Sequence, residues 1–138
     1  MIEGHCLCGA VRLRVDDADH RVGACHCRMC QRWSGGLFLC FDAKTVEVEG
    51  AVARYQSSPF AERAFCPVCG SHLWMRDLTE GGGYDLMPGL FDEAIQWPMR
   101  SEIYTDRALA SVKLAGDHRR ATRVEYEAKN DHIEGDAP

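Results

Sequence analysis

The chain has 138 residues, the length of one domain, and 46% of them are hydrophobic, which is enough to form a core. Its 16 basic and 21 acidic side chains give a formal net charge of −5. That balance argues against a nucleic-acid-binding protein, because such proteins usually carry a basic surplus. No apolar run approaches the roughly 20 residues that span a bilayer, and the first residues do not read as a secretory signal. We therefore expect a cytoplasmic protein with neither nucleic acid nor membrane as a partner, for which a homodimer is possible.

Short runs of alternating apolar and polar residues predict β-strands along most of the chain. In chain order the expected strands cover residues 11–15, 37–41, 46–49, 51–55, 63–65, 71–75, 84–87 and 101–104. Helix is expected only over 28–33, ending near Gly35-Gly36, and over 108–114. The glycine run 81–83 predicts a loop, and the polar residues 129–138 predict a frayed tail. The predicted fold class is therefore mainly β with little helix, in a single domain over residues 1–128.

The eight cysteines are the most informative residues of the chain. They are Cys6, Cys8, Cys25, Cys27, Cys30, Cys40, Cys66 and Cys69. Cytosolic thiols stay reduced, so clustered cysteines there are more often metal ligands or catalysts than disulfides. An even number permits a disulfide framework, but two cysteines separated by one residue are poorly placed to bridge each other. The pattern therefore favours metal sites.

Residues 66–70, Cys-Pro-Val-Cys-Gly, have the form of a zinc knuckle. The two-residue spacing lets both sulfurs face one ion, and the glycine lets backbone amides turn toward the thiolates. Zinc prefers four ligands in a tetrahedron, so a second pair is needed. Either Cys6 and Cys8 supply it, leaving the cysteines of residues 25–30 as a three-thiolate group, or two of those cysteines supply it and the first pair stands alone.

The first arrangement yields one closed site and one site that lacks a ligand. Closed zinc sites are structural, whereas catalytic zinc keeps an open position for water or substrate. A further side chain can instead close the second site, and the candidates are Cys40, His26, His5 and His72. His26 lies between two of the cysteines, so its ring should point away from their metal. Cys40 lies in an apolar run, which is typical of a buried core thiol.

In their order and spacing, these segments resemble the glutathione-dependent formaldehyde-activating enzyme family, which shares its zinc-binding domain with centromere protein V. The matching segments run from residue 4 to about residue 93 and comprise Cys6-x-Cys8-Gly9-Ala10-Val11, Cys25-His26-Cys27-x-x-Cys30-Gln31-Arg32, Ser34-Gly35-Gly36-x-Phe38, Tyr55-Gln56-Ser57-Ser58, Arg63-Ala64-Phe65-Cys66-x-x-Cys69-Gly70-Ser71-x-Leu73 and Gly89-Leu90-Phe91-Asp92. The region after residue 100 matches poorly.

The resemblance implies a Mss4-like β fold pinned by zinc. It implies a structural zinc on Cys6, Cys8, Cys66 and Cys69, and a catalytic zinc on Cys25, Cys27 and Cys30. It also implies an activity of the carbon–sulfur lyase type, which joins the thiol of glutathione to formaldehyde to give S-hydroxymethylglutathione. A different small aldehyde or thiol would use the same site.

Three thiolates on Zn²⁺ leave the open site with one net negative charge. Sulfur donates charge to the metal, so the site is less suited to making hydroxide than to holding a fourth thiol as a thiolate. Cations should stabilise that product, and Arg28 and Arg32 are candidates to bind the carboxylates of glutathione. His26 is a candidate catalytic proton donor. The alternative is that His26 only supports the metal ligands through a hydrogen bond.

A non-catalytic interpretation stays open beside the enzyme. The same zinc-pinned fold can serve as a binding or chaperone module, for which a four-cysteine site is sufficient. The enzyme requires Cys25, Cys27 and Cys30 with an exposed fourth position. The middle cluster therefore separates the two hypotheses.

Overall fold

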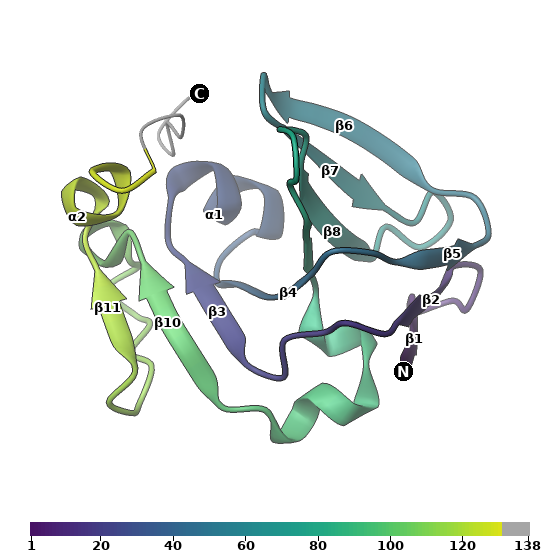
Figure 1. Ribbon diagram of the computed structural model, residues 1–138, viewed down its shortest axis with the longest axis horizontal. Helices are drawn as coiled ribbons and strands as arrows, with labels where there is room; N and C mark the ends of the chain where they lie inside the picture. The colour runs from purple at the N-terminus through teal and green to yellow at the C-terminus, as the bar shows by residue number, and fades with distance from the viewer. Residues whose placement is uncertain (131–138) are drawn as a thin grey trace. The chain divides into compact units, whose positions relative to one another are not determined.

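The computed structural model describes residues 1–130, which fall into two compact units (Figure 1). The first unit contains Met1–Arg21 and Cys40–Trp97, and the second contains Val22–Leu39 and the chain from Pro98 onward. Within residues 1–130, no helix is long and apolar enough to cross a membrane. The polar tail predicted over 129–138 lies outside the described residues from position 131 on, and the single domain over 1–128 stays a prediction.

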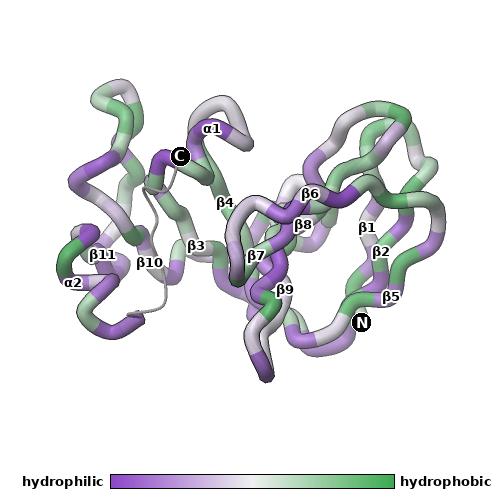
Figure 2. The backbone as a smooth tube through the Cα atoms, turned by 90° about the horizontal axis from the view of Figure 1, so that it is seen from above, coloured by the Kyte–Doolittle hydropathy of each residue, from purple (hydrophilic) through white to green (hydrophobic). Residues whose placement is uncertain are grey.

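The first unit begins with a three-stranded antiparallel sheet in the order β1 (Ile2–His5), β2 (Arg12–Val15), β5 (Glu47–Glu49). Leu13 and Val15 of β2 are buried, whereas Arg12 and Arg14 are exposed, and the colours of Figure 2 alternate accordingly along this strand. Successive side chains of a strand point to opposite faces, so this period of two places one face on the core. The strand predicted from the alternation at 11–15 is confirmed.

Five further antiparallel strands follow in the order β4 (Phe38–Ala43), β9 (Tyr84–Leu86), β8 (His72–Asp77), β7 (Ala61–Phe65), β6 (Ala53–Ser58). They belong to the first unit except for the first two residues of β4. Two 3₁₀ turns follow β9, η1 (Pro88–Leu90) and η2 (Asp92–Gln96). The core of the unit includes Trp74 and Phe41. The Phe41 ring packs edge-on against the rings of Phe91 and Trp97, with ring centroids 5.2 and 4.9 Å apart. Burial of side chains of this size stabilises the fold by about 1.5–3 kcal/mol each.

The second unit is built on three parallel strands, β3 (Val22–Cys25), β10 (Met99–Ile103) and β11 (Arg119–Ala121), with β10 in the middle. Its helices are α1 (Arg28–Ser34), the 3₁₀ turn η3 (Thr105–Arg107) and α2 (Arg123–Glu127). Helix α1 begins after Cys27, whose side chain accepts from the Cys30 amide, and it ends at Gly35 in the left-handed conformation. The helix predicted over 28–33 is confirmed.

The mainly β class with little helix is also confirmed, but two helix predictions differ from the structure. The helix expected over 108–114 is wrong, because this stretch forms a turn and coil. Leu109 is 38% exposed and Ala110 is exposed, so the segment buries no apolar stripe at helical spacing. Helix α2 was missed although its N-terminus carries a capping box, in which Thr122 and Glu125 each bond the other's amide.

Candidate metal centres

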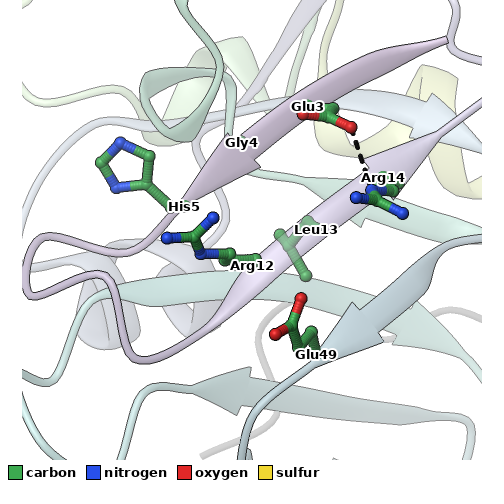
Figure 3. A pocket seen from close by; sticks show the side chains of 7 residues that line it. All are labelled: Glu3, Gly4, His5, Arg12, Leu13, Arg14 and Glu49. Carbon is green, nitrogen blue, oxygen red and sulfur yellow. Dashed lines mark ion pairs between the residues drawn. The ribbon is translucent and has the colours of Figure 1, made fainter.

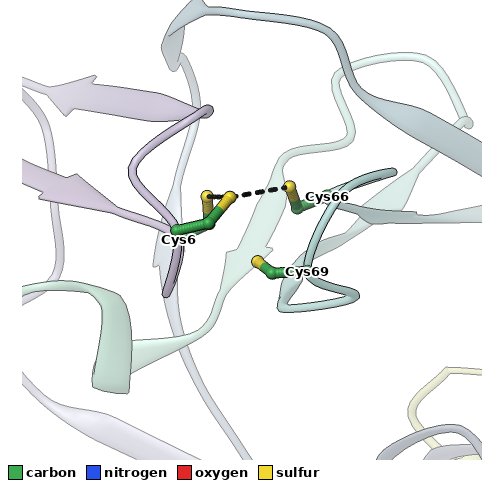
Figure 4. Close-up of side chains that lie close together, drawn as sticks. Cys6, Cys66 and Cys69 are labelled. Carbon is green, nitrogen blue, oxygen red and sulfur yellow. Dashed lines mark hydrogen bonds between the residues drawn. The ribbon is translucent and has the colours of Figure 1, made fainter.

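Four cysteine sulfurs converge in the first unit, two from the β1–β2 turn and two from the β7–β8 turn (Figure 4). The ligand atoms of Cys6, Cys8, Cys66 and Cys69 all lie within 4.8 Å of one another. Cys8 Sγ is 3.6 Å from Cys6 Sγ and 3.8 Å from Cys66 Sγ. A tetrahedron with Zn–S bonds of about 2.3 Å places its sulfurs about 3.8 Å apart. The number, chemistry and spacing of these donors therefore fit a closed zinc site.

Both turns of this four-cysteine site have the same backbone geometry. The Gly9 amide donates to the Cys6 carbonyl at 3.0 Å, and the Gly70 amide donates to the Cys66 carbonyl at 2.9 Å. The two glycines have φ values of 77° and 75°, in the region that residues with a Cβ rarely adopt. The knuckle turn predicted at 66–70 is thus present, and a related turn occurs after Cys6.

Hydrogen bonds to the sulfurs separate the pKa values of the four thiols. The hydroxyl and amide of Ser71 hold the pKa of Cys69 down to about 5, and Ser71 Oγ lies 3.2 Å from Cys69 Sγ. The Ala10 amide acts to lower the pKa of Cys8, but burial and the three neighbouring thiols raise it to about 11. A lowered pKa favours the thiolate, which is the form that zinc binds.

A second group of three cysteines lies in the second unit, where β3 leads into α1. Cys25 ends β3, Cys27 caps α1 and Cys30 lies in its first turn, and their sulfurs all lie within 4.8 Å of one another. The neighbouring thiols of Cys27 and Cys30, with burial, raise the pKa of Cys25 well above its ordinary value. Within residues 1–130, no fourth histidine, cysteine or carboxylate joins this group. This donor set fits a zinc ion that keeps one coordination position open.

The side chains considered as a fourth ligand have other positions. Cys40 is buried and forms its own group with Asp42 and Asp85 in the first unit. The His5 ring lies 2.8 Å from the Cys6 carbonyl, also in the first unit. His72 lies in β8 of that unit, where burial and the charge of Arg63 lower its pKa. None of the eight cysteines forms a disulfide, and seven of them belong to the two clusters.

His26 is buried between Cys25 and Cys27, and its side chain meets a carboxylate. His26 Nε2 lies 2.8 Å from Glu102 Oε1, and the His26 amide donates to the Ile103 carbonyl at 3.0 Å. Glu102 Oε2 also accepts hydrogen bonds from the side chains of His118 and Arg120. Glu102, His118 and Arg120 were not predicted from the sequence as residues of this site. His26 and Glu102 are 76 residues apart in the chain, so no local pattern connects them. A single glutamate in a short strand also gives no local sign that it is buried.

The two arginines proposed for carboxylate binding are exposed on α1. Arg28 and Arg32 are four residues apart, so they share one face of the helix. Arg28 Nη1 donates to Gln31 Oε1 at 2.7 Å, and Gln31 Nε2 donates to the Arg107 carbonyl at 2.8 Å. The buried Gln31 therefore links Arg28, and with it the start of α1, to η3.

A shallow hollow on the outer face of β1, β2 and β5 has a different character (Figure 3). Its lining carries charges of both signs, and Arg14 Nε lies 2.9 Å from Glu3 Oε1 with both side chains more than half exposed. Opposite charges on neighbouring strands form such pairs on solvated sheet faces. This hollow needs no ligand to explain it.

Comparison with known proteins agrees with the cysteine pattern. The model of the glutathione-dependent formaldehyde-activating enzyme family matches residues 1–107. A Schizosaccharomyces pombe protein, named an uncharacterized lyase, is 37% identical over 92 residues, which cover 64% of this chain and 67% of that protein. A Halomonas elongata protein, provisionally named a glutathione-dependent formaldehyde-activating enzyme, is 39% identical over 90 residues, which cover 56% of this chain and 57% of that protein.

A solved structure shares the fold. The crystal structure of a Rhodobacter sphaeroides protein covers 86% of this chain and 99% of its own, with a TM-score of 0.57 and 21% sequence identity. At that identity the likeness concerns the arrangement of the backbone alone.

Proposed function

Since the chain belongs to the glutathione-dependent formaldehyde-activating enzyme family, we propose that it is a zinc-dependent enzyme of the carbon–sulfur lyase type. It forms or breaks the adduct of glutathione with formaldehyde or another small aldehyde. The observation that carries this proposal is the three-cysteine cluster, which no fourth side chain of residues 1–130 completes. A purely structural site would be closed, as the four-cysteine cluster is.

We assign different roles to the two clusters. Cys6, Cys8, Cys66 and Cys69 would hold a structural zinc. Cys25, Cys27 and Cys30 would hold the catalytic zinc, which when bound supplies a position where an incoming thiol is kept as a thiolate. The glutathione sulfur then attacks the aldehyde carbon, a C–S bond forms, and the electron pair of the C=O π bond moves to oxygen. That oxygen takes up a proton, and the reverse reaction returns aldehyde and thiol.

The arginines of α1 and His26 have different roles in this proposal. Arg28 and Arg32, exposed on one face of α1, bind the carboxylates of glutathione, for which a guanidinium is well shaped. Of the two roles considered for His26, we propose the supporting one, because its Nε2 is already occupied by Glu102 and its ring is buried. A proton for the product oxygen would then come from solvent.

The alternative of a non-catalytic binding module has one observation in its favour. Leu7 and Val68, which lie at the tips of the two knuckle turns, are 85% and 74% exposed. A contiguous patch of exposed apolar side chains often marks a contact with another protein, and a binding module would use these two side chains in such a patch. Such a module would need the four-cysteine site and would make no use of the middle cluster.

Zinc stoichiometry, measured by elemental analysis with and without glutathione, tests the proposal. The protein is purified with added zinc and no chelator, as wild type, Cys27→Ser and Cys40→Ser. We expect two zinc ions in the wild type and in Cys40→Ser, which loses a thiol outside both clusters, and one in Cys27→Ser. Glutathione should alter the retention of the second zinc only. A single zinc in the wild type, unaffected by Cys27→Ser or by glutathione, would favour the binding module.

A further inference from the structure

A buried cluster of polar and charged groups in the second unit takes no part in the bond-forming steps of the proposed reaction. The Glu102 side chain is 8% exposed, and those of His26 and His118 are 3% exposed. Glu102 Oε1 accepts from His26 Nε2 at 2.8 Å, and Oε2 accepts from His118 Nε2 at 2.5 Å and from Arg120 Nε at 3.1 Å. Three donors therefore meet one carboxylate, and both histidines use Nε2 to reach it.

The carboxylate is ionised in this arrangement. Burial acts to raise the pKa of Glu102, but the hydrogen bonds from His118 and His26 outweigh it, so the pKa lies below its ordinary value. A buried charge that lost these partners would be strongly destabilising. The cluster is thus a set of mutually dependent groups, in which each donor helps to hold the others.

His26 connects this cluster to the three cysteines. It stands between Cys25 and Cys27 in the chain, and two bonds attach it to β10: its amide to the Ile103 carbonyl at 3.0 Å and its ring to Glu102. Cys25 lies opposite Ile103 in the parallel pairing of β3 with β10. Both the backbone and the side chain of the residue between two sulfurs are therefore held by one strand, which limits how far those sulfurs can separate.

Arg120, in β11, bonds both to Glu102 and to the loop that precedes this strand. Arg120 Nη2 donates to the carbonyls of Leu114 and Gly116 at 3.0 and 2.9 Å, and Arg120 Nη1 donates to the His118 carbonyl at 3.3 Å. Gly116 has a φ of 118°, and a Cβ there would lie 3.2 Å from His118 Nδ1. One arginine thus holds the loop closed while its Nε reaches Glu102, and the absence of a side chain at Gly116 leaves room for the imidazole.

We propose that Glu102 is a positioning residue of the three-cysteine site, and that the segment 114–120, a loop that leads into β11, completes that site through His118 and Arg120. This inference rests on the proposed function, because it assumes that the three cysteines bind a metal. The loop lies beyond the matched residues 1–107 of the family model. Glu102 acts through His26, since metal sites depend on the carboxylates that orient the groups around their ligands.

The test follows zinc release from the full chain to a chromophoric chelator, with the absorption spectrum of the cobalt(II)-loaded protein as a second readout. The phase that belongs to the three-cysteine site is identified by its loss in Cys27→Ser. Glu102→Gln keeps the size of the side chain but places an amide against two imidazole N–H groups. Glu3→Gln, which breaks an exposed ion pair with Arg14 in the first unit, is the matched control.

We expect Glu102→Gln and His118→Gln to release zinc from the three-cysteine site about 10- to 100-fold faster, the range typical when such supporting groups are lost. The cobalt–thiolate bands of that site should shift, while release from the four-cysteine site and the behaviour of Glu3→Gln should not change. If Glu102→Gln does not fold, Gly116→Ala places a Cβ 3.2 Å from His118 Nδ1 without removing the carboxylate, and the same readouts are followed.

The possible failures are distinguishable. A wild type whose release matches that of Cys27→Ser would refute the proposed function, and the present inference with it. Two phases in the wild type with both unchanged in Glu102→Gln would refute the inference alone. An equal acceleration of both phases would mean that Glu102 supports the fold in general, and it would also overturn the positioning role.

Discussion

The four-cysteine cluster sits on two backbone turns between antiparallel strands, whereas the three-cysteine cluster sits where a strand passes into a helix. In the first case each pair of sulfurs is placed by a turn that bonds to itself, glycine amide to cysteine carbonyl. In the second case the residues beside the cysteines, His26 and Gln31, bond to residues far along the chain, Glu102 and Arg107.

Two metal sites built from cysteine ligands can therefore differ in the hydrogen bonds that position those ligands. A turn that closes on itself and is sealed by a fourth thiolate suits a permanent zinc. A cluster held by tertiary bonds and open on one side suits a ligand that comes and goes. The predictions below test the contrast, and they begin with the largest expected effect.

Cys66→Ser should prevent the first unit from folding stably. A structural zinc site contributes its binding free energy to folding, about 10–16 kcal/mol in small zinc domains, and Cys66 is fully buried. Thermal unfolding followed by circular dichroism measures the effect. Cys27→Ser is the comparison, and we expect it to keep a cooperative transition near that of the wild type. Equal damage from the two substitutions would show that the division into structural and catalytic clusters is wrong.

Gln31→Ala should loosen the three-cysteine cluster and leave the four-cysteine cluster unaffected. The Gln31 side chain joins Arg28 to the Arg107 carbonyl, and its loss leaves that carbonyl without this donor. We expect the free energy of unfolding to fall by about 1–3 kcal/mol. Denaturant titration gives this value, and zinc release should accelerate for the three-cysteine site only. Gln56→Ala, at an exposed position of β6, serves as the control. Faster release from the four-cysteine site would contradict the separation of the two supports.

Ser71→Ala should move the acid limit of the four-cysteine site upward in pH. The Ser71 hydroxyl and amide hold the pKa of Cys69 at about 5, below the ordinary thiol value. A depressed pKa contributes stability that is complete above the unfolded value and is lost as the pH falls through the folded value. Without the hydroxyl the folded pKa rises, so zinc should be lost at a higher pH, while retention at neutral pH changes little.

Zinc content against pH, measured after equilibration and removal of free metal, checks this expectation. Ser111→Ala, at an exposed position in the coil before β11, is the control. If the acid midpoint of Ser71→Ala coincides with those of the wild type and Ser111→Ala, the hydroxyl does not tune the site. A shift confined to the three-cysteine zinc would contradict the assignment of Ser71 to the other cluster.

The spacing of residues in the sequence was sufficient to predict those strands, helix ends and turns that depend only on neighbouring residues. The alternation of Leu13 and Val15 with arginines predicted a half-buried strand, and Gly35 marked the end of α1. The Cys-x-x-Cys-Gly pattern predicted the turn at 66–70, because a glycine that adopts positive φ closes it. These are restraints between residues a few positions apart, so the printed sequence contains them directly.

Only the tertiary structure decided which distant groups meet. Spacing alone left open which cysteines complete the knuckle. The β1–β2 and β7–β8 turns belong to different sheets, and the tertiary fold brings Cys8 to Cys66 across 58 positions. The same holds for Glu102, which joins His26 and His118 because β10 runs between β3 and β11. The stretch 108–114 has residues that allow a helix, but Leu109 and Ala110 are exposed there and the stretch forms a turn and coil. Burial and strand order depend on the whole chain, and therefore no local pattern reports them.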